Sequence, residues 1–160
     1  MAKQYWLMKT EEDVFSFDDL INCPDHTDSW DGIRNYQARN FMRDEFSLGD
    51  KVFIYHSNTK DIGIYGVAEV VKEAYPDHTA LDPKAKYFDA KSAEKGVSRW
   101  MMVDVKATHR MTKPILLSDL KTMPELDGLA LLQRGQRLSI QKVSSEHWKI
   151  IYQLGKAKKI

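Results

Sequence analysis

Short runs of apolar and aromatic residues, separated by polar turns, recur along the chain and predict at least five β-strands. The runs combine β-branched and aromatic side chains, which pack well on a pleated surface. The predicted strands cover residues 5–8, 51–56, 62–71, 100–106 and 138–143. Two glycines, Gly63 and Gly66, interrupt the third strand. Glycine inside a strand indicates a bend, a bulge or the close approach of another group.

Capping residues predict short helices between these strands. Ser16 and Asp19 have the spacing of a capping box, and the helix that they predict ends in a turn-rich loop at 22–28. Asn35 is expected to cap a helix over 35–45. Three-and-four spacing assigns an inward face to that helix, made of Ala38, Phe41, Met42 and also Tyr36.

The second half of the chain is more irregular. Further helical turns are predicted at Ser118 and over 126–132, and Ser144 or Ser145 is expected to cap a last helix. From 75 to 98 the periodic pattern is lost, which predicts a long loop of a size that is often functional or mobile.

These elements favour an α+β fold. Five or more strands with short helices and irregular loops, and without regular βαβ alternation, predict a curled or barrel-like sheet. A doubly wound sheet is not expected, because no glycine-rich phosphate-binding pattern follows a strand. The basic tail over about 155–160 is expected to be a frayed, solvated end.

Composition narrows the class of protein. With 160 residues and 42% hydrophobic content, the chain can bury one sizeable core, so we expect a single domain over 1–160. Its 24 Lys and Arg residues nearly cancel 23 Asp and Glu residues, so no overall field exists to hold a long polyanion. Any nucleic-acid partner must therefore be bound by local contacts and not by the overall charge of the protein.

The sequence also limits where in the cell the protein is expected. Lone Cys23 excludes an internal disulfide and a multi-cysteine zinc site, which fits a reducing compartment. No apolar run approaches the roughly 18 residues that span a bilayer, and the first residues lack the apolar core of a signal peptide. We expect a soluble, intracellular protein with no membrane partner, cytoplasmic in a bacterium and nuclear or cytoplasmic in a eukaryote.

Catalytic and metal-binding patterns are weak. Cys23 and His26 could suggest a nucleophile and a base, but cysteine is more commonly an inert small hydrophobe. The five histidines are scattered and match no metal-ligand spacing. The carboxylates at 11–13 and 18–19 stand where helix N-termini use them. We expect no metal, no cofactor and no catalytic residue.

Binding features concentrate in residues 29–41, which open on a Trp30-Asp-Gly turn. Trp30 could stack on a flat ring, although a buried structural role is the competing interpretation. The segment also holds amide and guanidinium groups that can pair with base edges or phosphate, from Arg34, Asn35, Gln37, Arg39 and Asn40. A solvated helix face would explain the arginines alone.

Two other places could complete a pocket. Ser57 and Asn58 follow a predicted strand in a loop, and Arg99 and Trp100 open another strand. If Trp30 and Trp100 faced each other across a cleft, they would form a stacking slot that stabilises a bound base by roughly 1 to 3 kcal/mol.

The order of these segments resembles a known family. The matching blocks are 30–40, 55–58, 63–71, 73–77, 98–100, 103–105 and 138–141, which together cover nearly the whole chain and are similar to the signature blocks of the EVE domain. The resemblance implies the PUA-like fold, a curled β pseudo-barrel with peripheral short helices, related to the YTH and ASCH domains. It implies recognition of a nucleic-acid base, a modified one, in an aromatic-lined pocket, in RNA or DNA.

Site residues follow from the resemblance by position. It implies Trp30 and Trp100 as pocket walls and Arg34, Arg39 and Arg99 near phosphate. It places the following residues near the base or nucleotide: Asn35, Tyr36, Gln37, Tyr55, His56, Ser57 and Asn58.

Two other functions stay open at this point. One is a nucleotide- or RNA-processing enzyme of the ASCH type, with His56, Asp104 and Tyr55 as acid and base groups. The other is a protein-interaction module whose aromatic residues form a partner surface.

Overall fold

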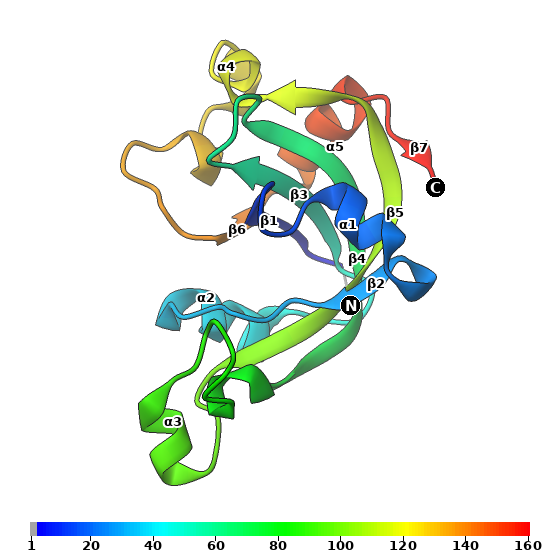
Figure 1. Cartoon of the computed structure of the whole chain (residues 1–160). Helices are drawn as coiled ribbons and strands as arrows, with labels where there is room; N and C mark the ends of the chain where they lie inside the picture. The colour runs from blue at the N-terminus through cyan, green and yellow to red at the C-terminus, as the bar shows by residue number, and fades with distance from the viewer. Residues whose placement is uncertain (1–2) are drawn as a thin grey trace.

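The computed structural model describes residues 3–160 and contains a mixed β-sheet that curls on itself, with short helices along its edges (Figure 1). In sheet order the strands run β2-β5-β4-β3-β1-β6, and β7 pairs with β5. β1 and β3 are parallel, whereas the other pairs are antiparallel. The strands are β1 (Tyr5–Glu11), β2 (Thr27–Ser29), β3 (Lys51–Ser57), β4 (Gly63–Pro76), β5 (Met101–Leu116), β6 (Ile140–Val143) and β7 (Lys158–Lys159).

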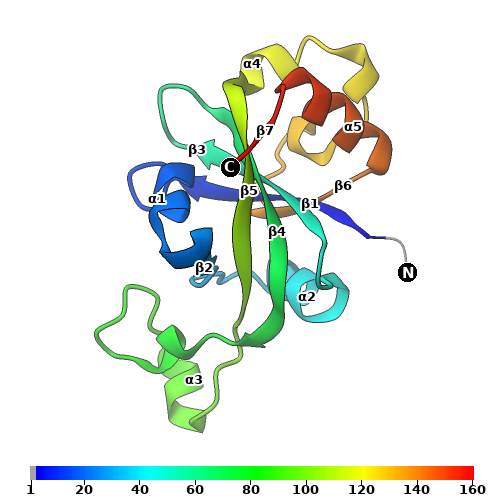
Figure 2. The ribbon, with the colours of Figure 1, turned by 90° about the vertical axis from the view of Figure 1, so that its right-hand side faces the viewer.

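β4 and β5 are much longer than their neighbours and run side by side through the whole molecule (Figure 2). Their pairing shifts register at four places, and each shift adds twist and bend to the ribbon. The far ends of both strands extend beyond the rest of the sheet and carry a helical loop, which includes α3 (Ala90–Lys95). The sheet therefore has a curled part and a projecting arm.

The other helices are also short. α1 (Phe17–Asn22) follows β1, α2 (Tyr36–Asn40) follows β2, and α4 (Leu117–Leu120) follows β5. The longest, α5 (Ser145–Leu154), packs on the curled part near the C-terminus (Figure 1). One-turn helical segments complete the chain, namely the π-helical turn Phe41–Glu45 and the 3₁₀ turns Pro24–His26, His78–Leu81, Pro124–Leu126 and Ala130–Leu132.

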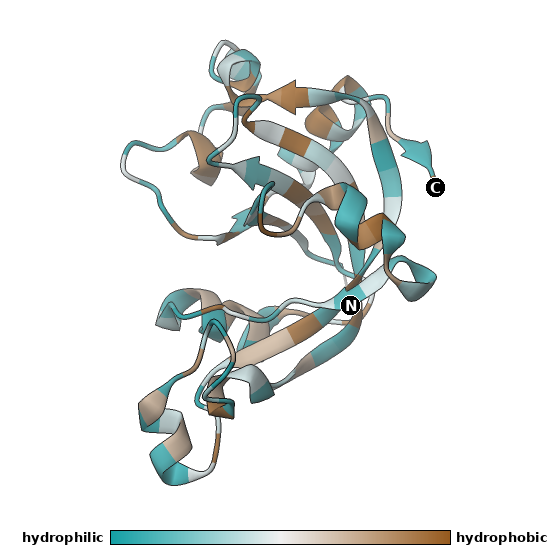
Figure 3. Ribbon diagram, in the orientation of Figure 1, coloured by the Kyte–Doolittle hydropathy of each residue, from teal (hydrophilic) through white to brown (hydrophobic). Residues whose placement is uncertain are grey.

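Side chains alternate between two hydrophobic cores, as the period of a strand requires. From β1, Trp6 and Met8 enter the first core, whereas Leu7 enters the second. The first core receives α1, α2 and Trp30, and the second receives α5 through Trp148. Figure 3 shows hydrophobic bands along the strands and α5, with hydrophilic residues in the loops and β7.

Several elements predicted from the sequence are confirmed. All five predicted strands are present, although β4 and β5 run well beyond their predicted ends. Ser16 and Asp19 form the expected capping box, and the Asn35 side chain accepts a hydrogen bond from the Ala38 amide at the start of α2. Ser144 caps α5. The α+β class with a curled sheet is therefore confirmed.

Three local predictions were wrong or incomplete. Tyr36 was expected to point inward, but it is 50% exposed. The loop at 22–28 contains a 3₁₀ turn and continues into β2, which pairs with β5. The C-terminal tail is not frayed, because β7 adds to β5 and the Ile160 amide donates to the Thr108 carbonyl. Pairing occurs there because the outer side of β5 offers free backbone groups.

Gly66 provides a test of how α1 sits on the sheet. A Cβ atom at Gly66 would overlap the Phe17 ring. Gly66→Ala should therefore lower the free energy of unfolding by about 1–3 kcal/mol, as overpacking does. In a Phe17→Leu background the same substitution should cost less, because the smaller side chain leaves room. Equal losses in both backgrounds, measured by urea unfolding, would contradict the contact.

Candidate nucleic-acid interface

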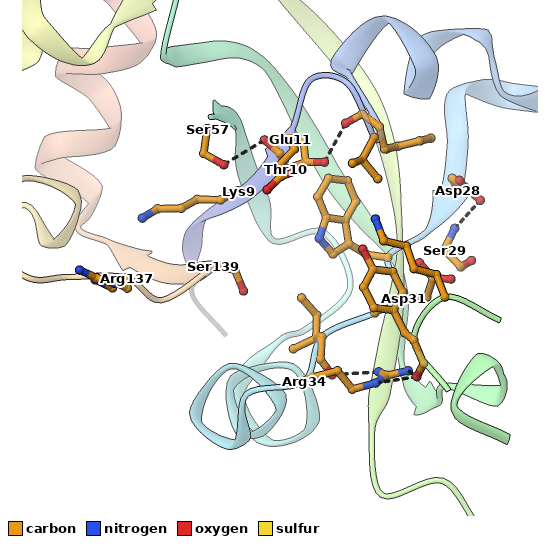
Figure 4. Close-up of a pocket in the computed structure, with 17 residues that line it drawn as sticks. Lys9, Thr10, Glu11, Asp28, Ser29, Asp31, Arg34, Ser57, Arg137 and Ser139 are labelled. Carbon is orange, nitrogen blue, oxygen red and sulfur yellow. Dashed lines mark hydrogen bonds between the residues drawn. The ribbon is translucent and has the colours of Figure 1, made fainter. Parts of the chain in front are cut away.

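A pocket of about 670 Å³ lies where the curled part of the sheet meets the arm (Figure 4). Its volume is within the range of small-molecule sites. One side is formed by the end of β1 with Lys9 and Glu11, and by Ser57 at the end of β3. The opposite side is formed by residues 28–34 and by Lys86 and Tyr87 of the arm. Arg137 and Ser139, ahead of β6, close the rim.

Trp30 is the aromatic wall of this pocket. Its backbone amide donates to the Val103 carbonyl at 2.7 Å, which extends the pairing of β2 with β5. The Phe15 ring meets the indole edge-on, with centroids 6.0 Å apart. Only 7% of Trp30 is exposed, so its ring is rigidly held by the first core. Trp30 is therefore a core residue, as the structural interpretation expected, and it also lines the pocket.

The turn after Trp30 requires glycine. Gly32 has a φ of +78°, and an added Cβ would lie 2.5 Å from the Tyr87 ring. Its amide donates to Asp77 Oδ2 at 2.9 Å. The turn is thus pressed against the Tyr87 ring and tied to the arm by Asp77, so that Trp30 and Tyr87 both line one cavity.

Asp77 is fully buried and collects several donors. Besides Gly32, the Arg34 guanidinium donates to it at 2.9 Å, and the Thr79 amide donates at 2.9 Å. Burial alone would raise the pKa of Asp77, but the hydrogen bonds from Thr79, Gly32 and Arg34 outweigh burial and hold that pKa below its usual value. Arg34 also donates twice to the Tyr87 carbonyl, at 3.0 and 2.6 Å. Arg34 therefore fixes the pocket wall.

The rim carries charges of both signs. Within residues 3–160, Lys9, Lys86 and Arg137 form no ion pair, which leaves three cations available to an anionic ligand. Burial lowers the pKa of Lys9. The carboxylate of Asp31 faces the same pocket, and partial burial together with nearby Asp77 raises its pKa. A ligand here meets flat apolar rings, cations and a carboxylate acceptor.

Of the residues expected at the site, Trp30, Arg34 and Ser57 line this pocket. Trp100 does not. The residue is 4% exposed, and its indole donates to Asp89 at 2.8 Å and stacks on Tyr36 with centroids 4.9 Å apart. The two tryptophans therefore do not face each other across the pocket, because the Asp89 carboxylate holds Trp100 toward α3.

The remaining expected residues lie outside the pocket. Asn35 serves as the helix cap, and Gln37 is exposed on α2. Arg39 and Arg99 lie beside Tyr36, with guanidinium carbons 4.8 and 5.7 Å from its ring centroid. Asn58 occupies a turn with a φ of +53°.

Groups proposed for acid–base chemistry are separated from the pocket. His56 is 2% exposed, and its Nε2 accepts the Phe17 amide at 3.0 Å. Burial lowers the pKa of His56. Tyr55 is buried in the second core, and Asp104 accepts the Tyr75 hydroxyl at 2.5 Å. None of the three groups lines the pocket.

Sequence reasoning missed Lys9, Asp31, Lys86, Tyr87 and Arg137 as pocket residues. Tyr87 stood in the long loop over 75–98, whose length is typical of functional loops. Lys86 stood in the same loop, and Asp31 stood in the Trp30-Asp-Gly turn that opens residues 29–41. Lys9 and Arg137 carried no local signal, since their convergence on the pocket depends on the fold. In the described part of the chain, no cluster of three or more His, Cys, Asp or Glu side chains could hold a metal. Nor is any described helix long and apolar enough to cross a membrane.

The profile of the EVE domain matches residues 4–154. Human thymocyte nuclear protein 1 is 40% identical over 167 residues, which cover 94% of this chain and 73% of that protein. A solved hypothetical protein from Leishmania major is 46% identical with a TM-score of 0.89, over 97% of this chain and 96% of that one.

A further solved structure contains a ligand. It is human THYN1 in complex with 5-methylcytosine-containing DNA, at 40% identity and a TM-score of 0.87, over 98% of this chain and 99% of that one. The PUA-like α+β fold implied by the resemblance is confirmed by these matches.

Asp77→Asn tests the tie between the turn and the arm. We expect the free energy of unfolding to fall by about 2–3 kcal/mol, because charge-assisted hydrogen bonds are lost and the Arg34 charge keeps no carboxylate partner. The folded pKa of Asp77 is lowered, so its contribution is present above the unfolded pKa of about 3.9 and is lost as pH falls.

The difference between wild type and Asp77→Asn should therefore be full at pH 7 and shrink in acid. Asp61→Asn, at an exposed position, is the matched control and should change little. A difference between wild type and Asp77→Asn that stays constant from pH 7 to pH 3, in urea unfolding, would contradict this assignment.

Proposed function

The chain belongs to the EVE domain family, and from that premise we propose that it binds nucleic acid by taking one modified base into the pocket beside Trp30, without catalysing a reaction. The observation that carries the proposal is the combination, in one pocket of about 670 Å³, of aromatic rings and of cations that form no ion pair with residues 3–160. A base outside a helical stack exposes two flat faces and a polar edge, and such a pocket can contact all of them.

Shape and rigidity support insertion of a single base. Trp30 is held by the first core and Tyr87 by its contact with Gly32, so neither ring needs to be ordered when a ligand binds. Preorganised rings bind more tightly because less conformational entropy is lost. Stacking on an aromatic side chain contributes roughly 1 to 3 kcal/mol per base.

The distribution of charge supports binding of phosphate at the pocket itself. The formal net charge of the chain is only +1, so long-range attraction is small. Lys9, Lys86 and Arg137 instead place positive charge around the mouth of the pocket. The backbone on either side of an inserted base would pass near these side chains.

DNA is the better supported partner, since human THYN1 is seen with DNA that contains 5-methylcytosine. A non-catalytic role is supported by the position of His56, Tyr55 and Asp104, which do not line the pocket. We propose 5-methylcytosine as the first base to test, with RNA of the same sequence as the comparison ligand.

Trp30→Ala should weaken binding of a labelled single-stranded oligonucleotide with one 5-methylcytosine by about 5- to 150-fold, the range expected for loss of one stacked base. Fluorescence anisotropy measures the dissociation constant. Because Trp30 also belongs to the core, Trp30→Phe accompanies it and should keep the fold and part of the affinity. A folded Trp30→Ala protein with unchanged affinity would remove Trp30 from the site.

Asp31 gives a sharper test of which base edge is read. A carboxylate accepts a hydrogen bond from the exocyclic amine of cytosine, whereas thymine presents a carbonyl there and carries the same methyl group. The wild type should therefore prefer 5-methylcytosine over thymine, and Asp31→Ala should lose about tenfold or more of that preference.

The ratio of the two affinities controls for the loss of negative charge, which affects both oligonucleotides alike. Asp28→Ala, at another acidic residue of the pocket, is the matched control and should keep the preference. If Asp31→Ala retains the wild-type ratio, Asp31 does not read the base edge.

A further inference from the structure

Four residues that the sequence placed in the pocket gather instead beside it, where α2 contacts the arm. Tyr36 and Arg39 come from α2, and Arg99 and Trp100 lie just before β5. Arg39 donates to the Arg99 carbonyl at 3.1 Å, so the two segments are joined directly. We call these four residues the Tyr36 platform.

The platform is an aromatic stack with a fixed base. Trp100 is buried, and its indole is held by Asp89 at 2.8 Å. Tyr36 stacks on it at 4.9 Å with an interplanar angle of 28°, and its hydroxyl accepts from Arg99 at 2.6 Å. Despite these contacts Tyr36 is 50% exposed. The ring is thus both immobilised and open to solvent, as a stacking surface for a base must be.

Charge on the platform is only partly neutralised. Asp89 pairs with Arg99 at 2.7 Å. Arg39, whose guanidinium carbon lies 4.8 Å from the Tyr36 centroid, forms no ion pair with any described residue. Its hydrogen bonds go to the Arg99 carbonyl and the Asn40 amide oxygen. An uncompensated guanidinium beside an exposed ring complements a nucleotide, which carries an anion next to a base.

The platform is continuous with the pocket through Arg34. The Arg34 guanidinium carbon lies 5.6 Å from the Trp100 ring centroid and 5.7 Å from the Tyr87 ring centroid. Arg34 and Tyr87 both line the pocket. Arg34 therefore contacts both Tyr87 and Trp100, and Trp100 stacks on Tyr36, so a continuous series of contacts joins the pocket wall to the platform.

We propose that the Tyr36 platform binds a nucleotide that flanks the inserted base, with its base stacked on Tyr36 and its phosphate against Arg39. This inference rests on the proposed function, because it assumes that the strand enters at the pocket. It assigns the platform to single-stranded nucleic acid, since a flanking base within a duplex is already stacked on its neighbours.

The test uses a labelled single-stranded DNA pentanucleotide with a central 5-methylcytosine. In further versions one base at a time, central or flanking, is replaced by an abasic residue, which keeps every phosphate. For the wild type, removing one particular flanking base should weaken binding about fivefold or more. In Tyr36→Ala the intact and the flank-abasic oligonucleotides should bind equally. A purely structural role of Tyr36 would instead lower the affinity for both by the same factor.

The salt dependence of binding tests the contact between Arg39 and phosphate. Arg39→Gln should make the slope of log affinity against log salt concentration shallower by about 0.7, the value for one phosphate contact on a single strand. Arg43→Gln is the matched control, because Arg43 follows α2 but is exposed and paired with Asp44, and its slope should equal that of the wild type. Urea unfolding establishes that each variant is folded.

Each result supports or overturns the assignment. If no flanking abasic site weakens wild-type binding, or if Tyr36→Ala keeps the wild-type sensitivity, the platform is overturned while the pocket stands. If the central abasic site also has no effect, the proposed function fails as well, and the inference fails with it. An unchanged salt slope in Arg39→Gln removes the phosphate contact.

Discussion

The buried carboxylate of Asp77 is the constraint on which the candidate site depends. It holds the Gly32 amide and the Arg34 guanidinium at the same time, each at 2.9 Å. Gly32 positions the turn that follows Trp30, and Arg34 in turn binds the Tyr87 carbonyl. A single charge inside the protein thus joins the turn after Trp30 to the arm. Because that charge is saturated with donors, its burial costs far less than burial of an isolated carboxylate would.

Structural contacts and ligand-facing surface are divided between different parts of the same residues, or between different residues of the pocket. Trp30 offers one part of its ring to the core and another to the pocket, which makes it rigid without a dedicated support. The Arg34 guanidinium is paired with Asp77, whereas Lys86 and Arg137 form no ion pair with any described residue. The pocket in this way offers cations to a phosphate beside carboxylates and aromatic rings, although the chain as a whole is close to neutral.

The sequence predicted the strands well because their signal is local. Alternation on β1 and the caps at Ser16 and Asn35 need only neighbouring residues to be recognised. Tyr36 was misplaced because it is the first residue of α2, and because the helix continues as a π-turn from Phe41, which changes the phase of any three-and-four pattern. The pairing of β7 with β5 also escaped, since the two strands lie far apart in sequence.

The site was only half predictable for the same reason. Residues 30–34 are contiguous, so their chemistry could be read directly, and the likeness to the EVE domain supported it. In the sequence Trp100 has the same ability to stack on a base as Trp30, but its indole is held by Asp89 and does not line the pocket. Lys9 and Arg137 gave no signal, because only the curl of the sheet brings the end of β1 and the segment before β6 to one rim.

The central claim is that one base enters the pocket beside Trp30, and intermolecular NOEs test it most directly. In a complex with a single-stranded oligonucleotide, the 5-methyl protons of 5-methylcytosine should show NOEs to the Trp30 indole and the Tyr87 ring. NOEs to Trp148 and Tyr152 instead, which line a separate pocket of about 370 Å³ beside α5, would contradict it. So would a bound oligonucleotide whose methyl group shows no NOE to the protein.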